Sequence, residues 1–145
     1  MLKHTAAIVA SSLVMALADL PIMVVQAPDS PVRLDHLKIF SADDAPHVLL
    51  YAATNVTDNE LDQFTVTVFV FDQEGRLKAR QVAPGRRTLD ARATKYSAMV
   101  LDVGTIAPTD SLLAGVDQAQ RAGSDQWWRA DLRALADQAV TAKKR

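Results

Sequence analysis

His36 and His47 are the two histidines beyond the N-terminal leader that could take part in acid–base or metal chemistry. A serine hydrolase also needs a nucleophile and an orienting carboxylate, and no Gly-x-Ser-x-Gly elbow is present. The nearby acids Asp35, Asp43 and Asp44 would suit a zinc site. However, we expect His36 in mid-strand and His47 at the loop end of the next strand, so they should not face each other. We therefore predict no enzymatic activity, no cofactor and no metal, and keep a metal-binding protein or metal-dependent enzyme using His36 and His47 as the alternative.

Trp127 and Trp128 form an adjacent aromatic pair near the C-terminus. Adjacent residues cannot both face one stripe of a helix, so one ring is expected to pack over Phe69 and Phe71 and the other to lie nearer solvent. An exposed tryptophan is a common anchor for a protein partner. The alternative is that both rings pack in the junction between the last strand and the helix.

Arg76, Lys78 and Arg80 alternate along one predicted strand. Further cations follow in the sequence: Arg86, Arg87, Arg92 and Lys95. Together these residues could give one hairpin a positive strip suited to an acidic partner or an anionic lipid. The alternative is that the charges only solvate an edge strand and discourage edge-to-edge pairing. The candidate partner-binding residues are thus Trp127, Trp128, Arg76, Lys78 and Arg80.

Composition excludes several other kinds of site. The chain has no cysteine, which rules out disulfides, thiolate metal sites and cysteine nucleophiles. A formal net charge of -1 gives no field to attract nucleic acid, so no nucleic-acid partner is predicted. The five glycines do not cluster before a helix, which disfavours a phosphate cradle.

The N-terminus has the layout of a secretory signal peptide over residues 1–18. A basic start precedes an apolar run, and small residues lie ahead of Asp19. A second candidate boundary, after Ala27, is disfavoured because Pro28 follows it. The alternative is an uncleaved membrane anchor over Thr5 to Ala27, although Asp19 and Pro21 interrupt that run. We expect an exported protein, periplasmic or extracellular, that contacts the membrane only if this segment is retained.

Short apolar or alternating runs, separated by turns about every ten residues, predict a mostly β protein. After an extended lead-in over 19–31, one domain is expected over 32–142. Phe64, Val66, Val68 and Val70 should point to one face of the clearest strand and Phe69 and Phe71 to the other, so something must cover both faces. The expected strands are 32–41, 47–56, 64–71, 76–82, 96–103 and 112–119.

A short C-terminal helix is expected from Ser124 onward. Trp128, Leu132, Leu135 and Ala139 recur at helical spacing. Ser124 or Asp125 would cap its first turn.

The stretch from Tyr51 to Thr57, followed by Phe64 to Gly75, resembles the core of the FxLYD-type immunoglobulin-like sandwiches. In that family a strand ending near an Asn-x-Ser/Thr turn pairs with a valine-rich strand that closes on an aspartate and glycine turn. The resemblance covers about half of the chain after residue 18. It implies an antiparallel immunoglobulin-like β-sandwich that acts as an exported binding or accessory module of the cell envelope, with an unknown protein partner.

Overall fold

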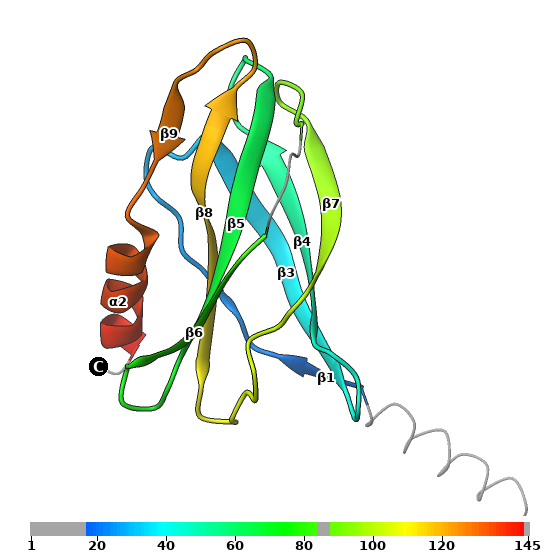
Figure 1. The fold of residues 1–145 in the computed structure, drawn as a ribbon, viewed down its shortest axis with the longest axis vertical. Helices are drawn as coiled ribbons and strands as arrows, with labels where there is room; N and C mark the ends of the chain where they lie inside the picture. Colours follow the sequence, from blue (N-terminus) through cyan, green and yellow to red (C-terminus); the bar gives the residue numbers. More distant parts are fainter. Residues whose placement is uncertain (1–16, 84–87, 144–145) are drawn as a thin grey trace, which may run out of the picture.

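The computed structural model describes residues 17–83 and 88–143, which form two facing β-sheets and one helix (Figure 1). Sheet A contains, in spatial order, β1 (Leu17–Leu20), β3 (Val32–Ala42), β4 (Val48–Asn55) and β7 (Thr94–Val100). Sheet B contains β2 (Met23–Val24), β8 (Ser111–Arg121), β5 (Leu61–Phe71) and β6 (Leu77–Val82), and β9 (Trp127–Arg129) also pairs with β8. All pairings are antiparallel except that of β2 with β8. The prediction of a mostly β sandwich with a short C-terminal helix is confirmed.

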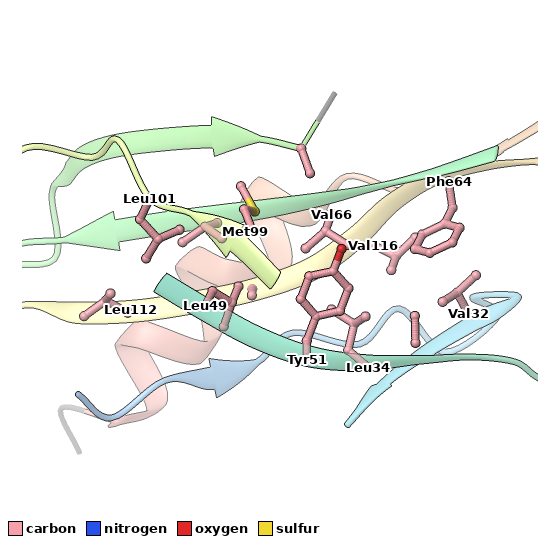
Figure 2. Packing of buried hydrophobic residues seen from close by; sticks show 14 of the residues in the cluster. Val32, Leu34, Leu49, Tyr51, Phe64, Val66, Met99, Leu101, Leu112 and Val116 are labelled. Carbon is pink, nitrogen blue, oxygen red and sulfur yellow. The ribbon is translucent and has the colours of Figure 1, made fainter. Parts of the chain in front are cut away.

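The main core fills the space between the two sheets (Figure 2). Tyr51 and Leu49 of β4 face Val66 of β5 and Val116 of β8 there, and all four are almost fully buried. As the alternation in β5 predicted, Phe64, Val66, Val68 and Val70 all belong to this core.

A second apolar cluster lies on the outer face of sheet B, where α2 (Leu132–Lys143) packs (Figure 1). This cluster contains Phe69 and Phe71 of β5 together with Leu132 and Ala136 of α2. The helix therefore covers the two rings that needed a cover.

The helix begins later than its apolar spacing predicts. Trp127 and Trp128 belong to strand β9, and α2 begins at Leu132. The cap is Asp131, whose Oδ1 accepts a hydrogen bond from the Ala134 amide at 3.1 Å, rather than Ser124 or Asp125. The prediction of a helix from Ser124 was wrong because pairing with β8 holds this segment extended.

The segment expected as an extended lead-in takes part in both sheets. Its first strand, β1, pairs with β3, and its second strand, β2, runs parallel to β8. Val25 and Ala27 are buried, at 5% and 3% exposure. The predicted signal peptide over 1–18 lies outside the described residues except for Leu17 and Ala18, which begin β1.

Candidate functional site

Residues at the end of β8 and the start of β9 line a cleft of about 340 Å³. Figure 1 shows this end of the sandwich, where the loop after β8 leads into β9. Its lining includes Trp127 and Trp128 of β9, together with Thr57 and Asn59 from the loop after β4. The remaining lining residues are Pro31, Leu61, Ala119, Arg121, Ser124 and Gln126. A cleft of this size, with aromatic walls and polar side chains at its margin, is typical of a binding site.

The two tryptophans have different surroundings because successive strand residues point to opposite faces. Trp128 pairs with Ala119 of β8 and packs against the core between the sheets. Trp127 is half-buried, with the Arg129 guanidinium 5.6 Å from its ring centre. Neither ring belongs to the cluster around Phe69 and Phe71, which α2 covers instead.

The turn between β8 and β9 is held by a chain of side-chain amides. Gln63 of β5 donates to the side-chain oxygen of Gln120 at 2.6 Å, and Gln120 donates to the Ser124 carbonyl at 2.8 Å. The Ser124 hydroxyl accepts from the Gln126 amide at 3.0 Å. Gly123 has φ +74°, a left-handed conformation that costs glycine little. These bonds fix the turn that directly precedes Trp127.

The loop after β4 is held in place by the buried side chain of Asn55. Its side chain is fully buried, and its amide donates to the carbonyls of Asn59 at 2.7 Å and Leu89 at 3.1 Å. Its side-chain oxygen accepts from the amide and the hydroxyl of Thr57, at 2.9 and 2.7 Å. The Asn-x-Thr turn therefore serves the fold, because its asparagine has no exposed surface.

Two backbone bonds connect the walls of the cleft. The Ala122 amide donates to the Glu60 carbonyl at 2.9 Å, and the Val56 amide donates to the Pro31 carbonyl at 3.0 Å. On the outside of the same loop, the hydrogen bond and charge of Arg92 hold the pKa of the Asp58 carboxyl below its ordinary value. These bonds hold the segments around the cleft in place.

The basic residues of β6 lie on a different surface. Arg80 pairs with Phe69, which pairs with Leu113, whereas Trp127 pairs with Gln120, seven residues further along β8. At about 3.3 Å per residue this separates Arg80 from Trp127 by roughly 23 Å. The structure thus does not bring the two groups of candidate residues together.

Each of the three predicted basic site residues, Arg76, Lys78 and Arg80, has a carboxylate partner. Arg76 contacts Asp72 at 3.3 Å, and Lys78 contacts Asp110, whose side chain is 2% exposed, at 2.5 Å. Arg80 lies 3.8 Å from Asp117. The backbone amide of Arg76, which bonds the Asp72 carboxylate, lowers the pKa of that carboxyl. Arg86 and Arg87, the next cations in the predicted strip, lie outside the described residues.

The two histidines are far apart. His36 lies in a bulge of β3 with φ +54°, and His47 immediately precedes β4. The pairing of Phe40 with Val48 places His47 about five residues along β3 from His36, or roughly 16 Å.

Within residues 17–83 and 88–143, no cluster of three potential metal-binding side chains occurs. That same part of the chain contains no helix long and apolar enough to cross a membrane.

No protein-family model matches this chain, and neither a curated protein nor a solved structure matches it significantly. The cleft at Trp127 and Trp128 is thus identified from the chain's own residues and geometry. The sequence pointed to the two tryptophans but not to Pro31, Thr57 and Asn59, because these lining residues are distant from them in sequence.

Proposed function

We propose that this protein is an exported, non-enzymatic binding module of the cell envelope that holds a protein partner at the cleft beside Trp127 and Trp128. The observation that supports this most directly is the pair of half-buried tryptophans on a preformed wall. Tryptophan is enriched among the residues that dominate binding energy, and a fixed wall lowers the entropy lost when a partner is ordered.

The chemistry of the cleft suits a peptide chain. The aromatic rings and Leu61 offer apolar contact, whereas Thr57, Asn59 and Gln126 offer hydrogen bonds. Trp128 Nε1 is buried and has no acceptor within the described part of the chain. This donor faces the protein interior, where a missing hydrogen bond costs about 1–3 kcal/mol, so partner contact falls to the exposed part of the cleft.

The immunoglobulin-like classification and the likeness to FxLYD-type domains belong to the same proposal. They agree with a sandwich that presents loops at one end and uses them for binding. Export is supported by the layout of residues 1–18 in the sequence.

The test is affinity purification of the tagged full-length chain from the envelope fraction of its host, with mass spectrometry of the bait and the co-purifying proteins. We expect Trp127→Ala to weaken binding of a stoichiometric partner by ~30-fold or more, as loss of an interface anchor does. The matched control is Arg76→Ala, which removes an exposed cation at the other surface and should leave binding unchanged. A partner lost with Arg76→Ala but kept with Trp127→Ala would place the interface at the turn before β6 instead.

A further inference from the structure

Arg121 is the one charged residue that lines the cleft beside Trp127 and Trp128, and it is exposed at the end of β8. Among the arginines that the structure describes, it alone has neither a carboxylate nor an aromatic ring as a partner. The others each have one: Arg33, Arg76, Arg80, Arg92, Arg129 and Arg133. A guanidinium presents a planar fork of N–H donors that matches a carboxylate, so this cation indicates an anionic group on the ligand.

Two neutral donors in the same lining are also available to a ligand. Asn59 and Gln126 are exposed, and their side-chain amides make no hydrogen bond within residues 17–83 and 88–143, although their backbone groups do. The lining contains no aspartate or glutamate. A carboxylate in the cleft would therefore meet a cation and amide donors, with no like charge in the lining itself.

The acids around the cleft favour a single carboxylate over a strongly acidic segment. Glu60 and Asp125 are exposed, and each lies in the sequence between two lining residues. Neither carboxylate has a cationic partner in the described part of the chain. Because like charges repel, these two acids disfavour a run of acidic residues close to Arg121. A ligand with one carboxylate beside apolar atoms suits Arg121 together with the tryptophans.

The size of the cleft favours the end of a chain. Its volume of about 340 Å³ is near the lower limit of the range of about 300–1,000 Å³ that is usual for ligand sites. A segment from the middle of a chain must both enter and leave such a space, whereas a chain end only enters it. A C-terminal residue also carries its carboxylate and its side chain on the same Cα, which matches one cation beside aromatic and apolar side chains.

We infer that the cleft binds the free C-terminus of the partner protein, with the terminal carboxylate on Arg121 and an apolar last side chain against the tryptophans. The inference rests on the function proposed above, because it names the part of the partner that the cleft holds. Capture of a C-terminal carboxylate is one of the recurring modes of peptide recognition. The side-chain amides of Asn59 and Gln126 supply further hydrogen bonds to the last residue of the partner.

The test starts from a library of random peptides that are displayed with free C-termini and selected on the full chain. Enriched sequences should end in an apolar residue. They are then synthesised with a free or an amidated C-terminus, and fluorescence anisotropy gives the affinity of each form. We expect amidation to weaken binding to the wild-type chain by about tenfold or more, because it removes a charge-assisted hydrogen bond.

Arg121→Gln should weaken binding of the free acid by about the same factor and leave binding of the amide nearly unchanged. The matched control is Arg76→Gln, which removes an exposed cation at the turn before β6. It should preserve the difference between acid and amide.

The outcomes separate this inference from the proposed function. Peptides that need Trp127 but bind equally well as acid and amide would overturn the inference and leave the proposed function standing. The same holds if affinity depends on an internal aspartate or glutamate, or if Arg121→Gln keeps the full effect of amidation. If the selection enriches no peptide whose binding Trp127→Ala weakens, the inference and the proposed function both fail.

Discussion

The buried amide of Asn55 holds together parts of the chain that are far apart in sequence. It bonds Thr57 and Asn59 in the loop that lines the cleft, and Leu89, which forms an isolated bridge with Leu61. Because its donors and acceptor are all matched, the residue contributes both to stability and to the shape of the cleft.

Asn55→Ala should lower the free energy of unfolding by about 3 kcal/mol, because it leaves buried carbonyls without a donor. Urea denaturation measures the change. The control is Asn59→Ala, since the Asn59 side chain is exposed and it is the Asn59 backbone that accepts the bond, so a change within about 0.5 kcal/mol is expected. Equal effects of the two substitutions would contradict this role for Asn55.

The strand β8 is where three elements meet, and Gly115 makes that meeting possible. β2 and α2 both pack on β8, and the Val25 amide donates to the neighbouring Ala114 carbonyl at 2.8 Å. A Cβ at position 115 would lie 2.4 Å from the Val25 carbonyl oxygen and 3.0 Å from a methyl of Leu132. The chain can approach β8 this closely because residue 115 has no side chain.

Gly115→Ala should therefore destabilise the protein by about 2–3 kcal/mol through overpacking, even though alanine is otherwise favoured over glycine in a strand. Thermal or urea unfolding gives the size of the loss. Two-dimensional NMR should show the largest shift changes at Val25 and Leu132. A variant as stable as the wild type would mean that the Val25 carbonyl does not lie over β8.

Local sequence patterns predicted the elements whose signals are strongest. The faces of β5 followed from its alternation because both faces are buried, one in each apolar cluster. The predicted start of α2 was too early because Trp128 lies at helical spacing before Leu132. In the structure Trp128 instead belongs to β9, which pairs with β8, and no local pattern in the sequence indicates that pairing. β2 has two residues between prolines, and no local pattern indicates that it pairs with Leu113 and Ala114.

The candidate site was predictable only in part, because tertiary structure brings its residues together. The tryptophan pair is conspicuous in the sequence, whereas the other lining residues come from separate segments of the chain. The basic strip looked unbalanced because its acidic partners, Asp110 and Asp117, lie some thirty residues or more further along the chain.

Residues 17–27 join the two sheets of the sandwich, because β1 pairs in sheet A and β2 pairs in sheet B. A chain that begins at Asp19 keeps β2 and the buried side chains of Val25 and Ala27. A chain that begins at Pro28 loses both strands. We expect the shorter chain to be less stable by about 3 kcal/mol or more, since burial of a valine alone is worth about 1.5–3 kcal/mol.

Unfolding curves of the two chains measure this difference, and Val25→Ala in the longer chain should reproduce part of the loss. Equal stabilities would show that the segment before Pro28 does not contribute to the fold. The expected loss also bears on the export proposed above. Cleavage after Ala27 would remove a strand from each sheet, whereas cleavage after Ala18 would remove only the first two residues of β1.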